Sequence, residues 1–332
     1  MRSDFIRFNA PLLVAASFLL TACTPNSSKE KNLPSFSQGL AQQTQSDLLK
    51  CKKVDSGGVP PRITNLGKIT SEDGLEWIVP ANIDLENDTK ASDLFNVCND
   101  VIPNSFADVD VTNFPIHDAG GEELFTAYVF GDNYFELNVN GKLKVVDPLP
   151  FTPFNSSVIR FKAQRPVTLA IKAVDWEEYL GQGFETFGKA KYHAGDGGIV
   201  IVIKDKNDKI VAVTDNSWKA QTYYIAPLKT KECLLVNGAT RNSSGCPTDD
   251  VPDGSQFYAA HWPLPIDWDA PNFNDQAWPQ ATTYSNEEIG VHNKPAFNHF
   301  TKLFDDNTGD ASFIWSDNVV LDNIVLLRKI IN

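Results

Sequence analysis

The sequence predicts an all-β protein whose main domain is an antiparallel β-sandwich with a small N-terminal extension. Short runs of β-branched and aromatic residues recur from about residue 124 onward, and Gly, Pro, Asn and Asp bound them. Helical periodicity is weak nearly everywhere. Many short strands without alternating helices are typical of an antiparallel sandwich.

Six runs carry the strand signal, and they are residues 124–130, 134–139, 158–161, 167–174, 198–203 and 210–213. The dipeptide Asn140-Gly141 follows the second run. These residue types accept the positive φ of a type I′ turn, so we expect a hairpin there. The polar residues 205–209 join the last two runs in a longer loop. Only residues 92–97 suggest a short helix.

The N-terminus has the pattern of an export signal. Arg2 and Arg7 precede an apolar run at residues 11–20, which is shorter than the ~20 residues that span a bilayer. The following tetrapeptide, Leu20-Thr21-Ala22-Cys23, resembles the lipobox of bacterial lipoproteins. The resemblance implies cleavage before Cys23 and acylation of its thiol, including palmitate, so that Cys23 anchors the mature chain in a lipid bilayer. A plain signal peptide followed by an unrelated cysteine is the alternative.

The resemblance also implies a location and a division of the chain. An aspartate after the lipidated cysteine usually retains such proteins in the inner membrane, and Thr24 stands there instead, which implies the outer membrane, on its periplasmic or cell-surface face. We expect a signal peptide at 1–22, the lipidated cysteine with a flexible polar tether at 23–50, an extension packed on the sandwich at 51–117, and the sandwich at 118–332.

Charge and cysteine content fit the cell envelope. The formal net charge of −13 argues against nucleic-acid partners and is compatible with divalent cations. Besides Cys23, an even number of cysteines remains, and in an oxidising compartment these would form disulfides. Sequence alone permits three connectivities, of which we expect the local one, Cys51 with Cys98 and Cys233 with Cys246.

Several motifs resemble galactose-binding-like jelly-roll domains, which are accessory modules of glycosidases and surface proteins. They lie at residues 131–141, 158–173, 213–219, 268–281 and 314–328. The order of these motifs carries the resemblance, which covers about residues 118–330. Asn274, in place of a paired aspartate, and the segment between Cys233 and Cys246 depart from the pattern. Independently, Trp218, Trp278 and Trp315 are expected to fill the space between two sheets.

A catalytic motif is not evident. The sequence lacks Gly-x-Ser-x-Gly, His-Glu-x-x-His and phosphate-binding glycine patterns, and its five histidines are scattered. The residues Asp175, Trp176, Glu177 and Glu178 follow the run at 167–174 directly, so we expect a loop at a sheet end. There an indole could stack on a sugar ring while carboxylates bind its hydroxyls. The alternatives are a solvated acidic loop, a catalytic acid pair, and a core role for Trp176.

Oxygen-bearing side chains elsewhere suggest a structural calcium ion. The candidate ligands are Asp132 and Asn133, the run at 196–198, and Asp305, Asp306 and Asp310. The last group lacks the acid spacing of a helix-loop-helix calcium site, and all of these residues also favour turns.

Taken together, these patterns predict a non-catalytic envelope lipoprotein whose sandwich binds a glycan or an envelope protein. One alternative is an enzyme acting on polysaccharide, with acids brought together in space. A structural or adhesin subunit without a small ligand is the other, because the fold alone does not choose among functions.

Overall fold

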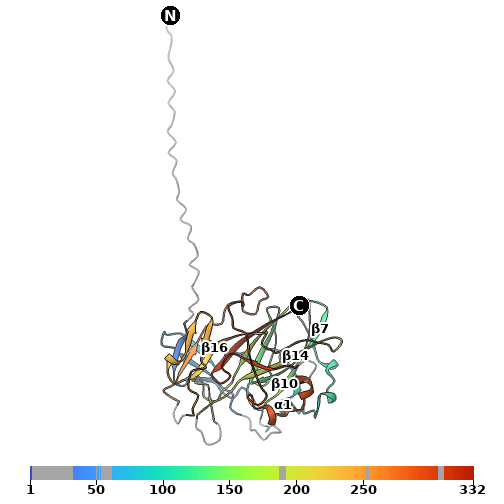
Figure 1. The fold of residues 1–332 in the computed structure, drawn as a ribbon, viewed down its shortest axis with the longest axis horizontal. Coiled ribbons are helices and arrows are strands. Elements are labelled where there is room, and N and C mark those ends of the chain that lie inside the picture. The colour runs from blue at the N-terminus through green and yellow to red at the C-terminus, as the bar shows by residue number, and fades with distance from the viewer. Residues whose placement is uncertain are drawn as a thin grey trace. The chain divides into compact units, whose positions relative to one another are not determined.

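A computed structural model describes residues 1, 33–49, 51, 53, 62–186, 192–250, 254–305 and 310–332. The chain divides into two units, Met1–Lys31 and Asn32–Asn332, and all the described strands and helices belong to the second (Figure 1). The expected signal peptide, Cys23 and the start of the expected tether lie outside the described residues. No helix in the described part of the chain is long and apolar enough to cross a membrane.

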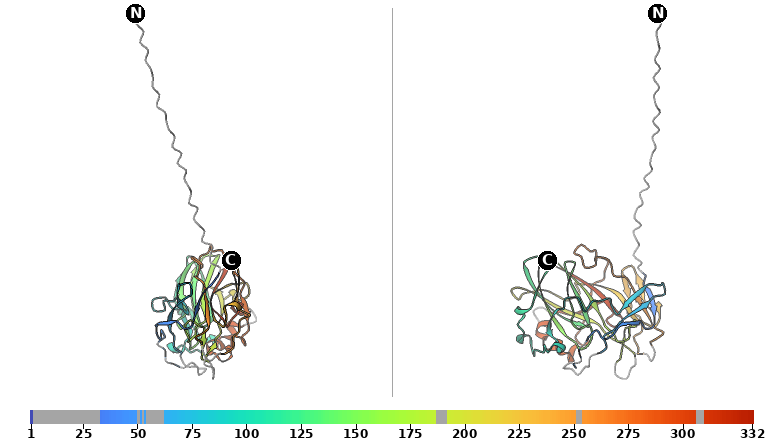
Figure 2. Two further views of the ribbon diagram at one scale, coloured as in Figure 1. Left: turned by 90° about the vertical axis from the view of Figure 1, so that its left-hand side faces the viewer. Right: turned by 180° about the vertical axis from the view of Figure 1, so that it is seen from behind.

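The unit from Asn32 is an antiparallel β-sandwich, as the sequence predicts, and its strands can be followed from three sides in Figures 1 and 2. One layer is a sheet of seven strands. In spatial order they are β1 (Ser35–Gln38), β19 (Tyr258–His261), β16 (Lys219–Leu228), β22 (Asp322–Ile331), β11 (Val167–Val174), β8 (Tyr134–Val139) and β9 (Lys142–Val146).

The other layer is a sheet of eight strands. Its main path runs β20 (Thr282–Tyr284), β21 (Phe313–Trp315), β14 (Gly198–Asp205), β7 (Glu123–Asp132), β10 (Ser156–Ala163) and β5 (Ser92–Phe95), while β15 (Ile210–Val213) pairs with β14 and β6 (Ile116–Asp118) pairs with β10. Among the described strands of this sheet only β6 runs parallel to its partner.

Smaller elements complete the unit. The short sheets are β2 (Gln42–Gln45) with β3 (Leu66–Thr70) and β4 (Glu76–Val79), β12 (Phe184–Glu185) with β13 (His193–Ala194), and β17 (Leu235–Asn237) with β18 (Thr240–Asn242). The helices are α1 (Pro295–Asn298) and α2 (Thr301–Phe304), and the 3-10 turns are η1 (Val97–Asn99), η2 (Phe106–Asp108), η3 (Val111–Asn113), η4 (Lys231–Cys233) and η5 (Val291–Asn293).

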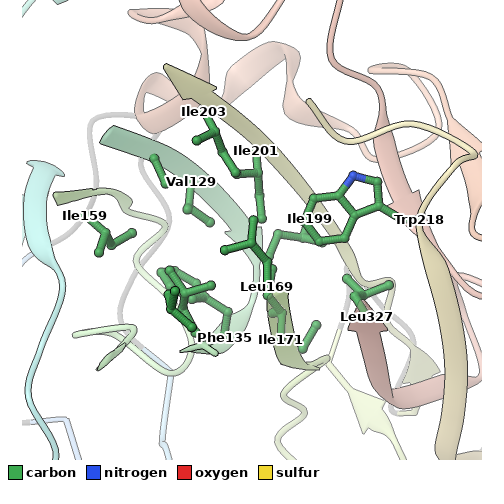
Figure 3. Close-up of a cluster of buried hydrophobic side chains, with 14 of the residues drawn as sticks. Val129, Phe135, Ile159, Leu169, Ile171, Ile199, Ile201, Ile203, Trp218 and Leu327 are labelled. Atoms are coloured by element: carbon green, nitrogen blue, oxygen red, sulfur yellow. The ribbon is translucent and has the colours of Figure 1, made fainter. Parts of the chain in front are cut away.

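Alternate side chains of facing strands form the core between the two sheets. The eight-stranded sheet contributes Val129, Ile159 and Ile201, and the seven-stranded sheet contributes Leu169 and Leu327, which Figure 3 shows converging in one cluster. The opposite face of β14 is also covered, because Val200 and Val202 pack against the α1–α2 segment. Burial on both faces explains why residues 198–203 are apolar at nearly every position.

Several local predictions are confirmed. Asn140 and Gly141 have φ of 52° and 77° and join β8 to β9 in a hairpin. The disulfides are Cys51–Cys98, with a Cα–Cα distance of 5.4 Å, and Cys233–Cys246, with 5.0 Å. Trp218 and Trp315 are buried between the sheets, but Trp278 packs outside that space, against Tyr223 on the other face of β16.

The N-terminal boundaries differ from the expectation. Residues 35–38 form strand β1, which pairs with β19, and residues 42–45 pair with β3, so this part of the expected tether belongs to the folded unit. The expected helix near residues 92–97 is wrong, since β5 pairs with β10 there and η1 follows it. Polar sequences at both places form strands because partners from distant segments complete their hydrogen bonds.

Candidate binding cavity at one end of the sandwich

A cavity of about 510 Å³ opens where strands of both sheets end together. Strand β7 ends at Asp132, which is paired with Gly198 at the start of β14. Strand β11 ends at Val174, which is paired with Tyr134 at the start of β8. The short connections that leave these strand ends therefore reach the same edge of the sandwich, and they supply the inner wall of the cavity.

Charged side chains dominate this wall. The acids that line the cavity are Asp132, Asp175, Glu177, Glu185 and Asp196, and the cations are Arg62 and Lys294. The guanidinium of Arg62 pairs with Glu185, and Lys294 pairs with Asp132. Among the described residues, Asp175, Glu177 and Asp196 have no ion-pair partner. Acidic side chains therefore outnumber basic ones in the cavity.

Asp132 and Asn133 position their neighbours. One carboxylate oxygen of Asp132 accepts from the Asn133 amide nitrogen at 2.8 Å, and the other accepts from Lys294. The Asn133 side-chain oxygen accepts from the backbone nitrogen of Trp176 at 2.6 Å. Burial raises the pKa of Asp132, and the ammonium of Lys294 opposes that rise. Lys294 thus supplies the positive charge beside Asp132 that the sequence prediction assigned to a calcium ion.

The other predicted calcium ligands are not brought together either. Asp305 is exposed and accepts from Asn286 at 3.0 Å, Asp310 is exposed, and Asp306 lies outside the described residues. In the described part of the chain, no group of three or more His, Cys, Asp or Glu side chains has an arrangement that could hold a metal ion. Of the run at 196–198, Asp196 lines the cavity.

Asp175 and Glu177 are the least satisfied acids of the site. Their side chains are 2% and 4% exposed, and burial raises the pKa of each carboxyl well above its ordinary value. Oδ2 of Asp175 and both carboxylate oxygens of Glu177 have no hydrogen-bond partner among the described residues. A buried carboxylate without donors is costly, so each needs a proton or a bound cationic group.

Trp176 is not a stacking platform. Its side chain is fully buried in a cluster with Tyr134, Phe151 and Val146, and its ring meets that of Tyr134 edge-on at 6.3 Å. Glu178 does not line the cavity and instead accepts from the backbone of Thr186 at 2.9 Å. Of the residues in the predicted loop, Asp175 and Glu177 therefore line the cavity, Trp176 is buried in its wall, and Glu178 lies outside it.

Sequence reasoning missed the residues that come from distant segments. Arg62 lies over the ring of Phe151 at 5.5 Å, and Lys294 lies over the ring of Phe154 at 3.9 Å, so the two cations of the cavity are each held against an aromatic face. Isolated Arg, Lys and Phe residues carry no local signal for such a site. The sequence predicted Asp132, Asn133 and Asp196 only as calcium candidates. Burial and the nearby Asp132 raise the pKa of Asp196 to about 7.

Comparisons of the chain with protein-family models, with curated proteins and with solved structures find no match. The resemblance to galactose-binding-like domains therefore rests on the sequence motifs alone.

Proposed function

We propose that this protein is an outer-membrane lipoprotein, anchored through Cys23, whose galactose-binding-like sandwich binds a glycan in the cavity at the end of β7, β11 and β14. The cavity itself carries the proposal. Its volume of about 510 Å³ fits a ligand of one or a few sugar rings, and small-molecule sites favour such concave places at strand ends.

The chemistry of the walls supports a polyhydroxylated ligand. A sugar hydroxyl both donates and accepts hydrogen bonds. Asp196 and the side chain of Asn293 supply acceptors, while Arg62 and Lys294 supply donors on the same cavity. The excess of acids favours neutral or amine-bearing sugars over anionic ones.

A glycan array probed with the full chain, extracted from membranes in detergent, tests this function. Asp196→Asn should weaken glycan binding at least tenfold, since a hydrogen bond to a charged group contributes about 1.5–3 kcal/mol. The control is Glu122→Gln, an exposed acid remote from the cavity whose side chain is 94% exposed. Absence of any bound glycan, or equal binding by both variants, would overturn the proposal.

The anchor has its own test. Replacing Cys23 by Ser removes the thiol that the lipobox presents, so incorporation of labelled palmitate should stop and the protein should leave the membrane fraction or accumulate as precursor. Continued labelling of the Cys23→Ser variant would show that Cys23 is not the lipidated residue.

A second candidate function is hydrolysis of a polysaccharide, and one observation favours it. Asp175, Glu177 and Asp196 line one cavity and form no ion pair with any residue that the structure describes. Hydrolysis of glycosidic bonds requires two carboxyl groups, one of which holds a proton. Release of reducing ends from a bound glycan, abolished by Asp196→Asn, would establish an enzyme. Binding without release would leave the binding function alone.

A further inference from the structure

A second, much smaller cavity lies behind the wall of the first. Its volume is about 10 Å³, which is space for a single water-sized particle. Asp175 and Glu177 line both cavities, and Tyr224 of β16 and Asn323 of β22 close the small one. The small cavity therefore joins the loop after β11 to two strands of the seven-stranded sheet.

Oxygen atoms without partners surround this space. They are Oδ2 of Asp175, Oε1 and Oε2 of Glu177, the hydroxyl of Tyr224 and Oδ1 of Asn323, and none has a hydrogen-bond partner among the described residues. All four side chains are at least nine-tenths buried. When both carboxyls are ionised, only the tyrosine hydroxyl can donate, so the set then consists almost entirely of acceptors.

The surrounding structure fixes these oxygens in place. The amide nitrogen of Asn323 donates to the carbonyl of Ala226 at 2.9 Å, which leaves its oxygen for the cavity. The backbone nitrogen of Asp175 donates to the carbonyl of Asn323 at 2.9 Å. Gly183 has φ of 62°, and a Cβ there would collide with Asn323 and Ala226, so a glycine is required for the loop to approach this closely.

Neither carboxylate forms an ion pair with a cation in the described part of the chain. Arg62 is paired with Glu185, and Lys294 is paired with Asp132. Two carboxylates, an amide oxygen and a phenol oxygen form an oxygen-only set, which hard cations prefer. Because it contains only two acids, this site is not one of the groups of three or more His, Cys, Asp or Glu side chains that are absent from the described part of the chain.

We propose that the small cavity is a binding site for one dehydrated Ca²⁺ ion, held by Asp175, Glu177, Tyr224 and Asn323. The two carboxylates match the charge of a divalent ion. Mg²⁺ retains several of its waters when bound, and the cavity has no space for them. The ion would tie the loop after β11 to β16 and β22 and thereby hold the inner wall of the larger cavity, whether or not that cavity binds glycan.

Calorimetric titration of the full chain with CaCl₂, after removal of metal by a chelator, tests the site. We expect one ion per chain in the unaltered protein. At a hundred times its Kd, calcium should raise Tm by about 5 °C, while MgCl₂ at the same concentration should change it much less. A flat calorimetric trace together with an unchanged Tm would overturn the proposal and would indicate a buried water with protonated carboxyls instead.

Two variants assign the ligands. Glu177→Gln should abolish calcium binding, and Tyr224→Phe, which removes only a hydroxyl, should weaken it about tenfold. The control is Glu122→Gln, because Glu122 is an exposed acid that lines neither cavity, and this change should leave calcium affinity unchanged. Undiminished calcium affinity in either Glu177→Gln or Tyr224→Phe would overturn the assignment. Should Glu177→Gln fail to fold, as judged by circular dichroism, Tyr224→Phe decides the question alone.

Discussion

Asp322 and Asp175 are buried to the same degree, but the fold surrounds them differently. Asp322, at the start of β22, accepts hydrogen bonds from the hydroxyls of Thr222 at 2.7 Å and Ser243 at 2.8 Å. Asp147 likewise accepts from the backbone of Leu149 and the side chain of Asn155. Asp175 and its neighbour Glu177 have oxygens with no donor in the described structure. Where a buried carboxyl is structural the fold supplies donors, so carboxyls without donors indicate a place for a ligand.

The largest effect is expected at the residue between the two unsatisfied acids. Trp176→Ala should destabilise the protein by about 3–5 kcal/mol, because it empties a fully buried aromatic site. Urea unfolding measures the loss. Unchanged stability combined with lost glycan binding would show instead that Trp176 is exposed and stacks on the sugar. It would also weaken the comparison between Asp175 and Asp322.

A matched pair of substitutions tests the contrast directly. In the presence of a chelator, Asp322→Ala should cost about 2–3 kcal/mol, since it leaves two buried hydroxyls without their acceptor. Asp175→Ala should change stability by no more than about 1 kcal/mol under the same conditions, because Oδ2 of Asp175 has no donor to lose. Equal losses in the two variants, measured by urea unfolding, would show that Asp175 has structural partners after all.

The stability should also depend on pH. Burial raises the pKa of Asp147 to about 8 and that of Asp322 to about 7. Each native carboxyl therefore keeps a proton that the unfolded chain releases above about pH 4. The stability from this source is fully present below about pH 4. It is lost as the pH rises from there through the native pKa of each group, by at most about 1.4 kcal/mol per pH unit for each group.

Asp147→Asn isolates one of these contributions, because an amide does not ionise and its oxygen can accept the same two hydrogen bonds. Urea unfolding at pH 5 and pH 8 should show a smaller loss of stability with rising pH in this variant than in the unaltered protein. Glu122→Gln, on the surface, should leave the slope unchanged. An identical slope in all three proteins would mean that Asp147 is ionised in the native state.

The fold was largely predictable from local patterns, whereas the candidate site was only partly so. The hairpin at Asn140-Gly141 and strand β14 carry strong signals in their own residues. Strand β1 does not, since its polar sequence becomes a strand only through pairing with β19, more than two hundred residues later. The same holds for Arg62 and Lys294, which reach one cavity from opposite parts of the sequence. Long-range placement of this kind leaves no trace in residue spacing.

The loop after β11 shows most clearly what a local sequence pattern cannot predict. Its sequence, with acids around a tryptophan, equally fits an exposed sugar-binding loop and a buried turn. Burial of Trp176 depends on Tyr134, Val146 and Phe151, which come from three other segments. Alternation of apolar and polar residues indicates which face of a strand is buried. It does not indicate how a loop packs where it crosses the end of a sandwich.

Strand β1 limits the length of chain between Cys23, the proposed anchor, and the sandwich. Pairing with β19 fixes Ser35 as part of the sandwich sheet, so residues 24–34 separate Cys23, the proposed site of lipidation, from a folded strand. A fully extended chain advances at most ~3.6 Å per residue, which limits the distance between Cys23 and Ser35 to about 40 Å. A tether reaching to residue 50 would have allowed more than twice that. If Cys23 is the anchor, as proposed, Ser35 stays within this distance of the membrane surface, and a Cys23→Ser variant would lose that restriction.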